Sequence, residues 1–208
     1  KAHATVYARL AWLTARLKAH YPREFYAAVL NGHKSMYPPR VFVWDALRHG
    51  IPVLPPDIHR SAAAWTPRPE GLRAGLGLIR GLSRHGCEAL LAARAQGGPF
   101  ADLPDLLARG SCRPSELEAL ILVGACAAWG PREDLLQHLY HSGGQARQPV
   151  LLRSAATTRL APLAVAQMAL TGIPFGIHPT DLLPVDGLCR AVDLPRHLEQ
   201  TVAMVGIL

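Results

Sequence analysis

The sequence predicts a mainly α-helical fold built from many short helices, and three observations support this prediction. Half of the 208 residues are hydrophobic, which is enough to bury a core. Apolar residues recur at steps of three and four along several segments, which is the period of an amphipathic helix. Gly and Pro number 18 each, so frequent turns argue against one long helical bundle.

The clearest predicted helices open the chain. Residues 4–21 form one helix with a single apolar stripe of Val6, Leu10, Leu13, Leu17 and Tyr21. A second helix starts at Pro22, a residue favoured at the first helical position, and runs to Leu30. The stretch up to Arg23 holds five Lys and Arg residues and no acid, so a mitochondrial targeting peptide is an alternative. The direct entry into a second helix, without a cleavable loop, argues against that alternative.

The next segments alternate helix with extended chain. A helix is predicted over 40–50, and Gly50 ends it. Residues 51–56 must be extended, because three prolines fix the backbone and remove N–H donors. A loop or short strand is predicted around Trp65, within residues 61–70.

A pair of helices joined by a tight turn is predicted after residue 71. Residues 72–79 form the first helix of this pair, Gly81 lies in the turn, and the second helix continues through Cys87. A further short helix is predicted over 103–108.

A second unit of the same kind is predicted over 113–129. Its first helix, 113–123, has Pro114 in the first turn, and Ser115 and Glu118 are spaced as a capping box. Gly124 breaks this helix before a second apolar stretch. The sequence therefore predicts two turns of similar design, of which the second is apolar and serves as the packing partner of the first.

The last quarter of the chain is predicted to be more irregular. Residues 142–149 have the Gly, Gln, Ser and Arg content of a linker, a short helix covers 160–171, and a strand opens near Thr201. A lone apolar strand at the end of a chain leaves a sticky edge. Because the chain also starts at Lys1 and not at Met, we expect a piece of a longer protein.

The charge balance favours an acidic partner. The chain has 22 Lys and Arg against 15 Asp and Glu, for a net charge of +7, so nucleic acid or an anionic membrane surface is expected to attract it. The longest apolar run, residues 119–129, is too short to cross a bilayer, so we expect no membrane-spanning segment.

The residues that could carry chemistry are too scattered to predict a catalytic site. The four Cys residues lie far apart without a C-x-x-C pair, which excludes a zinc ribbon and favours buried thiols in the cytoplasm. His138 and His141 are one helical turn apart without an acidic or Cys partner, so they are predicted on a solvated helix face. Asp102, Asp105, Glu116 and Glu118 are interpreted as caps and surface charges, because metal-assisted nucleotidyl transfer needs converging carboxylates. No catalytic residue, metal or cofactor is therefore expected in this chain.

The turn at residues 79–84 is the best candidate for binding a ligand. A Gly turn at the start of a helix points backbone N–H groups outward, and the helix dipole adds partial positive charge, so a phosphate can be held there. Arg80, Arg84 and His85 flank the turn, and Gly81, Leu82 and Ser83 form it. This pattern resembles the helix-hairpin-helix motif of sequence-independent DNA binders, with Ser83 in place of the usual second Gly. An ordinary connector between two helices is the alternative.

Four stretches carry a wider resemblance. They are residues 1–25, with Lys1, His3 and a Leu-Lys-Ala-His-Tyr-Pro ending; residues 46–61, with Gly-Ile-Pro-Val-Leu-Pro-Pro-Asp-Ile-His-Arg-Ser; residues 76–125, with Leu-Gly-Leu-Ile-Arg-Gly-Leu-Ser and Gly-Gly-Pro-Phe-Ala-Asp; and residues 172–179, Gly-Ile-Pro-Phe-Gly-Ile-His-Pro. Together they resemble the C-terminal half of the bacterial DNA polymerase III alpha subunit, a C-family polymerase. The resemblance covers nearly the whole chain.

The resemblance implies an order of domains. Residues 1–70 would be the C-terminal part of the polymerase fingers, and residues 71–141 a tandem helix-hairpin-helix domain. A linker with short helices over 142–195 would follow, and residues 196–208 would start a truncated OB-fold.

The resemblance also implies roles. Lys1, His3 and Arg9 would lie near the incoming nucleotide or the template, and residues 80–85 would bind duplex DNA. The palm carboxylates and their Mg²⁺ belong to the rest of the parent, so this fragment alone is not expected to be active. The dNTP and other replisome subunits would be partners of the parent.

Three readings of the function remain open at this point. The chain is a part of a replicative DNA polymerase, a part of its error-prone paralogue, or a stand-alone DNA-binding module without an attached enzyme. Paired aspartates encoded upstream of Lys1 would distinguish the first two readings from the third. An imported basic protein is a further alternative, which N-terminal cleavage before Pro22 would support.

Overall fold

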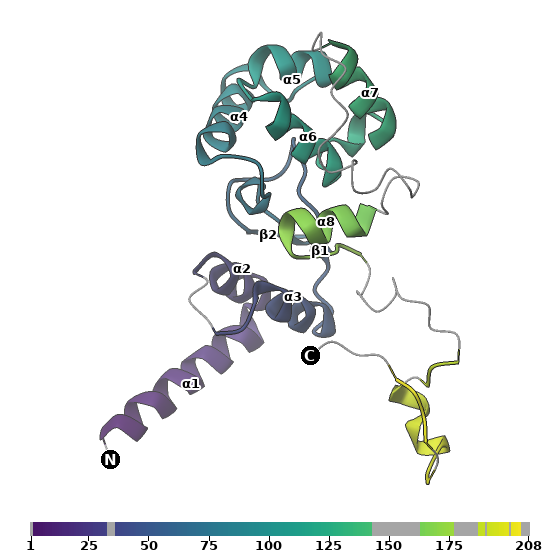
Figure 1. The fold of residues 1–208 in the computed structure, drawn as a ribbon. Coiled ribbons are helices and arrows are strands. Elements are labelled where there is room, and N and C mark those ends of the chain that lie inside the picture. The colour runs from purple at the N-terminus through teal and green to yellow at the C-terminus, as the bar shows by residue number, and fades with distance from the viewer. Residues whose placement is uncertain are drawn as a thin grey trace.

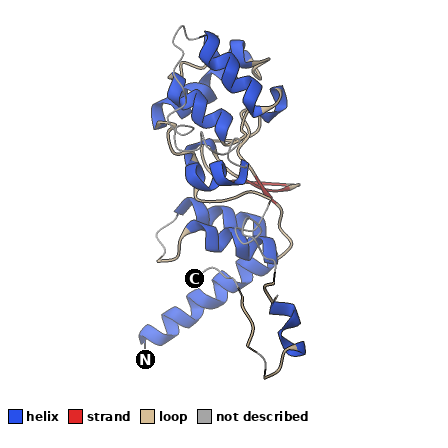
Figure 2. Ribbon diagram, turned by 45° about the vertical axis from the view of Figure 1, so that its right-hand side comes forward, coloured by secondary structure: helices blue, strands red, loops and turns tan. Residues whose placement is uncertain are grey.

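The fold is known from a computed structural model, which describes residues 2–32, 36–142, 163–176, 187–189, 191–199 and 201–204. It is mostly helical, as the sequence predicts, and it also contains one small sheet that the sequence does not predict. Figures 1 and 2 show helices α4 to α7 at one end of the molecule, α1 to α3 at the other, and the sheet and α8 between them.

The N-terminal end of the molecule is built from three helices, and the sheet packs against two of them. Helix α1 spans Ala2–His20, α2 spans Pro22–Gly32 and α3 spans Pro39–Arg48. The sheet has the order β1-β3-β2, in which β1 (Val53–Leu54) runs parallel to β3 (Gly71–Arg73) and β2 (Thr66–Arg68) runs antiparallel to it. One hydrophobic cluster joins α2, α3 and the sheet, with Tyr26, Val43 and Leu72 fully buried.

Helix α1 extends away from this cluster. Its predicted apolar stripe is exposed along its whole length, with Val6, Leu10, Leu13, Leu17 and Tyr21 between 42% and 65% exposed. Near its end, Lys18 Nζ lies 2.6 Å from Asp45 Oδ2 of α3, and the Tyr26 hydroxyl donates to the same oxygen. These contacts hold the C-terminal end of α1 while the rest projects outward (Figure 1).

The opposite end of the molecule is a cluster of helices around a larger core. It contains a 3₁₀ turn, η1 (Leu76–Leu78), then α4 (Arg84–Gly97), α5 (Leu103–Arg109), α6 (Pro114–Leu122), a 3₁₀ turn η2 (Ala127–Trp129) and α7 (Arg132–Ser142). Helix α8 (Leu163–Thr171) packs on this cluster through Leu170. A last 3₁₀ segment, η4 (Ala191–Arg196), lies outside both cores.

One predicted helix is wrong. Residues 72–79 form strand β3 followed by the single turn η1, not a helix. The cause lies in Gly75 and Gly77, which pack against the backbone of Ala63: a Cβ on Gly75 would lie 2.3 Å from the Ala63 carbonyl oxygen. The N–H groups of Leu76 and Gly77 bond the carbonyls of Ala62 and Ala63, so tertiary contacts replace the helical bonds.

Two further predictions differ from the structure at the ends of elements. The helix predicted to begin with a Ser115 to Glu118 capping box does begin at Pro114, but Glu116 receives the capping N–H, because it is the residue whose carboxylate reaches the Arg113 backbone. The predicted strand near Thr201 is not formed by residues 201–204, which have no regular secondary structure; among the described residues, Ala203 O accepts the Cys189 N–H. Residues 205–208 and the predicted linker 143–149 lie outside the described residues.

Candidate nucleic-acid interface

The first hairpin, residues 79–84, joins η1 to α4. Ile79 and Leu82 are buried and anchor it in the core, while Arg80, Gly81 and Arg84 are exposed. Gly81 has a φ of +96°, which a side chain would strain, and a Cβ there would lie 3.3 Å from the Ala119 Cβ of α6. The hairpin therefore lies close against α6 and presents its outer side to solvent.

The start of α4 leaves backbone donors available. Ser83 is the N-cap, and its Oγ accepts the Gly86 N–H at 3.0 Å. Among the described residues, no acceptor is paired with the backbone N–H of Gly81, Arg84 or His85. These N–H groups, together with the positive end of the helix dipole, can hold a phosphate oxygen.

One hairpin donor is already taken, by a carboxylate that the sequence analysis placed among caps and surface charges. Glu116 is 3% exposed; its Oε1 accepts the Ser83 N–H at 3.0 Å and its Oε2 accepts the Arg113 N–H at 2.8 Å. Burial alone would raise the pKa of Glu116, but the hydrogen bonds from Ser83 and Arg113 lower that pKa to about 2. Glu116 therefore stays charged and fastens the first hairpin to α6.

The cations of the first hairpin differ in their surroundings. The Arg84 side chain is 92% exposed and lies 2.8 Å from Glu88 Oε1, one helical turn away. Arg80 donates its N–H to Leu170 O at 2.8 Å and its Nη1 to Ala169 O at 3.4 Å, so helix α8 holds it. His85 is exposed at the start of α4. All six predicted DNA-binding residues are thus on one short segment, of which Leu82 is a buried anchor.

The second hairpin, residues 121–126, resembles the first in backbone conformation but not in exposure. Gly124 has a φ of +86°, and a Cβ there would lie 3.2 Å from Leu163 Cδ1 of α8. The N–H groups of Val123, Gly124 and Ala125 all bond carbonyls of α6. A pocket of about 330 Å³ beside this hairpin is lined mainly by apolar residues, including Ile121, Gly124 and Leu163. The second hairpin has no cation in its turn and packs against α8.

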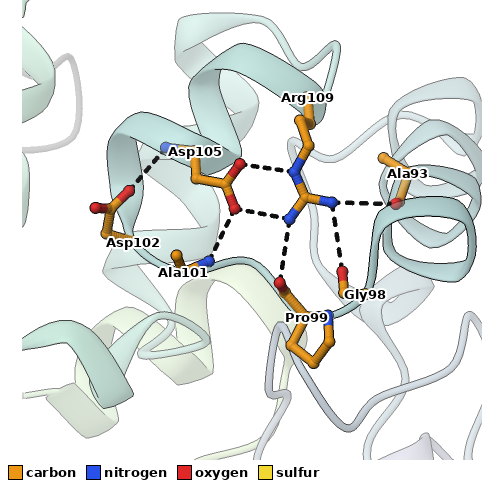
Figure 3. A network of polar contacts seen from close by, with 7 residues as sticks. All are labelled: Ala93, Gly98, Pro99, Ala101, Asp102, Asp105 and Arg109. Atoms are coloured by element: carbon orange, nitrogen blue, oxygen red, sulfur yellow. Dashed lines mark hydrogen bonds and ion pairs between the residues drawn. The ribbon is translucent and has the colours of Figure 1, made fainter.

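The Gly-Gly-Pro-Phe-Ala-Asp stretch after α4 is held by one arginine, which sequence reasoning did not identify. Arg109 makes two hydrogen bonds to Asp105, at 2.6 and 2.7 Å, and further ones to the carbonyls of Gly98 and Pro99 (Figure 3). Its guanidinium also lies 4.5 Å from the Phe100 ring centroid. The hydrogen bond from Arg109 and another from the Ala101 N–H lower the pKa of Asp105 to about 2.

The Pro-Pro-Asp-Ile-His-Arg-Ser stretch forms a turn that is hydrogen bonded to α4. Asp57 Oδ1 accepts the N–H groups of His59 and Arg60 at 2.8 and 3.1 Å. Arg94 of α4 donates to the carbonyls of Ile58 and Ser61, each at 2.7 Å. This stretch is therefore a structural support that joins the chain after β1 to the helical cluster.

The predicted nucleotide-side residues lie far from the first hairpin. His3 and Arg9 are exposed on α1, at the opposite end of the molecule from α4 (Figure 1). Lys1 lies outside the described residues. The structure therefore does not bring these two groups of candidate residues together.

The described part of the chain offers no arrangement typical of a metal site or a membrane-spanning segment. Within it, no three His, Cys, Asp or Glu side chains are grouped so that they could hold a metal ion. His138 and His141 lie on the exposed side of α7, as predicted. None of the described helices is long and apolar enough to cross a membrane.

Comparisons with known proteins agree with the geometry of the hairpins. A family model described as a helix-hairpin-helix motif matches residues 50–135. The DNA polymerase III subunit alpha of Thermus aquaticus is 38% identical over 163 residues, which is 76% of this chain and 13% of that protein. The error-prone DNA polymerase of Mycobacterium tuberculosis is 33% identical over 199 residues, 89% of this chain and 18% of that protein. The DNA polymerase III subunit alpha of Staphylococcus aureus is 37% identical over 142 residues, 66% of this chain and 13% of that protein.

Proposed function

We propose that this chain, which is related in sequence to bacterial DNA polymerase III alpha subunits and error-prone DNA polymerases over most of its length, grips duplex DNA through its first hairpin. The observation that carries the proposal is the combination at residues 80–85 of two exposed arginines with backbone N–H groups that have no acceptor among the described residues. Phosphates carry no sequence information, so the grip is independent of sequence.

The binding is mainly electrostatic. Arg80 and Arg84 each neutralise a phosphate charge and release counterions, so affinity falls steeply as salt rises. The net charge of +7 adds a general attraction to the polyanion. Because Glu88 already pairs with Arg84 in the free chain, a phosphate takes the place of that carboxylate on binding.

The grip serves a longer protein. The chain spans 13% to 18% of the length of the relatives named above. We therefore propose that it is a part of a cytoplasmic DNA-directed DNA polymerase that extends a primer with dNTPs, and that its active carboxylates lie in the rest of the protein. In this arrangement residues 1–70 are the end of the fingers and residues 71–141 the helix-hairpin-helix domain. Residues 142–195 connect them to an OB-fold that begins at 196–208.

The fingers part contributes cations near the nucleotide. His3 and Arg9 are exposed on a helix that carries no acidic residue, so that helix favours a phosphate-bearing ligand. With Lys1, we propose that they lie near the incoming nucleotide or the template in the longer protein. Primer extension by the longer protein with His3→Ala and Arg9→Ala tests this role, with an expected rise in KM for dNTP; an unchanged KM and kcat overturn it.

The experiment for the grip is a salt series of fluorescence anisotropy on the 208-residue chain. A labelled mixed-sequence duplex and a second unrelated duplex are titrated with the wild type and with the R80E/R84E variant. The expected result is a loss of affinity of at least tenfold for both duplexes alike. The R23E/R48E variant is the matched control, because it makes the same change in net charge at two exposed arginines away from the first hairpin.

Three outcomes contradict the grip. They are an equal loss in the two variants, a loss on only one of the duplexes, and no binding at low salt by folded protein. The last outcome favours the view that the hairpin is only a connector between helices.

A further inference from the structure

Helix α8 touches both hairpins, and its contacts are spread along its length. At its start, Leu163 packs against Gly124 of the second hairpin. In its middle, Gln167 Nε2 donates to the carbonyl of Val123 at 3.2 Å. At its end, the Leu170 carbonyl accepts the Arg80 N–H of the first hairpin at 2.8 Å. Since a helix rises 1.5 Å per residue, the contacts of α8 with the two hairpins, from Leu163 to Leu170, extend over about 10 Å along its axis.

Gln167 is the buried polar centre of this arrangement. It is 3% exposed, although long polar side chains are rarely buried unless both ends of the amide are hydrogen bonded. Its Nε2 donates to Val123 O, and its Oε1 accepts the Phe175 N–H at 3.1 Å. An apolar residue here would leave a buried carbonyl and a half-buried N–H without partners. The side chain thus fixes α8 against the second hairpin on one side and against residues 173–175 on the other.

Arg80 depends on where α8 ends. Its backbone N–H and its Nη1 are both bound by carbonyls of the last turn of α8, those of Leu170 and Ala169. A helix C-terminus carries partial negative charge and attracts a guanidinium. The remaining N–H groups of an arginine held in this way are oriented before a phosphate arrives, which lowers the entropy lost on binding.

We propose that Gln167 is a positioning residue for the duplex grip: by fixing α8 to the second hairpin, it places the helix end that holds Arg80. This inference rests on the proposed function of the first hairpin. Arg84 makes no contact with α8 in the described structure and pairs with Glu88 instead, so its role does not depend on Gln167. The effect of replacing Arg80 on duplex affinity therefore depends on the position of α8, whereas the effect of replacing Arg84 reports on the grip alone.

The test is a double-mutant cycle on the 208-residue chain. Gln167→Met keeps the side-chain length and removes both amide groups. Duplex affinity is measured by anisotropy for R80A and R84A, each in the wild-type and in the Q167M background. R80A is expected to weaken binding about fivefold in the wild type and less than twofold with Q167M, because Arg80 is bonded to the end of the helix that Gln167 positions. R84A is expected to cost the same factor in both backgrounds.

The control variant is Val165→Ala, an exposed position on the same helix, which leaves the R80A effect at its wild-type size. An R80A effect that is the same size with and without Q167M overturns the inference and leaves the proposed grip standing. If neither R80A nor R84A changes the affinity of the wild type, the proposed grip is overturned, and the inference with it.

If the Q167M variant does not fold, a second measurement, made on the wild type, tests the inference. Amide hydrogen exchange of the wild type is expected to protect the Arg80 N–H at least a hundredfold more than the N–H groups of Gly81 and Arg84, because only the first is bonded to α8. Equal exchange at these three positions overturns the inference.

Discussion

The Glu116 carboxylate accepts the backbone N–H of Ser83 at 3.0 Å, across 33 residues of sequence. The same carboxylate accepts the Arg113 N–H, so one buried charge joins the beginning of α4 to the beginning of α6. Both helix starts carry partial positive charge, which stabilises the carboxylate in the core. The first hairpin is therefore positioned by an internal anion next to the place where we propose that an external one binds.

Replacing the buried Glu116 by alanine is expected to lower the free energy of unfolding by about 2–4 kcal/mol, because two part-buried N–H groups lose a charged acceptor. Urea unfolding measures the change. Glu88→Ala is the control, since Glu88 is an exposed carboxylate in the second turn of α4. Its loss is expected to change the free energy of unfolding by less than about 0.5 kcal/mol. Equal losses in the two variants would show that the buried bonds contribute nothing beyond an ordinary surface charge.

The pH dependence of stability follows from the two carboxyls whose pKa is lowered to about 2, Glu116 and Asp105. Their pKa values are lower in the folded chain than in the unfolded chain, so the folded state releases these protons more readily. Their contribution is complete above the ordinary values of 4.5 and 3.8 and is lost as the pH falls toward about 2. Thermal melting between pH 6 and pH 2 is expected to show this loss, and Glu116→Gln is expected to flatten the curve.

Comparing Gly81→Ala with Gly50→Ala separates two costs of replacing a glycine of positive φ, which are backbone strain and a steric contact of the added Cβ. Gly50 has a φ of +72° with nothing within 4 Å of its missing Cβ, so alanine adds only backbone strain, about 1 kcal/mol. At Gly81 the contact with Ala119 adds to the strain, and a loss of about 2 kcal/mol is expected. Ala119→Gly alone is expected to cost about 1 kcal/mol, because glycine weakens a helix interior. In urea unfolding, G81A/A119G is therefore expected to lose less than the sum of the two single losses, and additive losses would mean that the contact with Ala119 is not the cause.

Arg109→Lys keeps the charge but cannot make the paired hydrogen bonds to Asp105 and the loop carbonyls. We expect the urea midpoint of unfolding to fall below that of the wild type, and the loop at residues 97–101 to be cleaved faster by a non-specific protease. Arg84→Lys is the matched control, because that arginine is 92% exposed and its exchange is expected to leave stability unchanged. A stable loop in Arg109→Lys would contradict the role shown in Figure 3.

The local signals in the sequence predicted most helices well. Periodic apolar residues predicted all four ends of α1 and α2 to within two residues, and the Pro and Gly signals predicted the beginning of α6 and the end of α3. Residues 72–79 failed because their apolar spacing is that of a helix, whereas Gly75 and Gly77 allow a close approach to Ala63 that only the folded chain reveals.

The turn at Gly81 forms where the sequence predicts it, while its DNA-binding role stays a prediction and the residues that support the turn were not predicted. The turn at Gly81 and the neighbouring Arg80 and Arg84 could be predicted, because they form a continuous sequence pattern. The partners that hold them, Glu116 and the end of α8, come from 33 and about 90 residues further along the chain, and no local period carries that information. Glu116 in particular was interpreted as a surface charge or cap because sequence alone does not show burial.

Leu170 and Ile173 are three residues apart, yet Leu170 is buried in the cluster of α4 to α7 and Ile173 in the cluster of α2, α3 and the sheet. If the chain between these two residues unfolded locally, one of the two side chains would have to leave its core. Heat is therefore expected to melt both parts in one shared transition, with equal calorimetric and van't Hoff enthalpies. The two ends of the molecule, which look separable along the chain, then form a single cooperative unit.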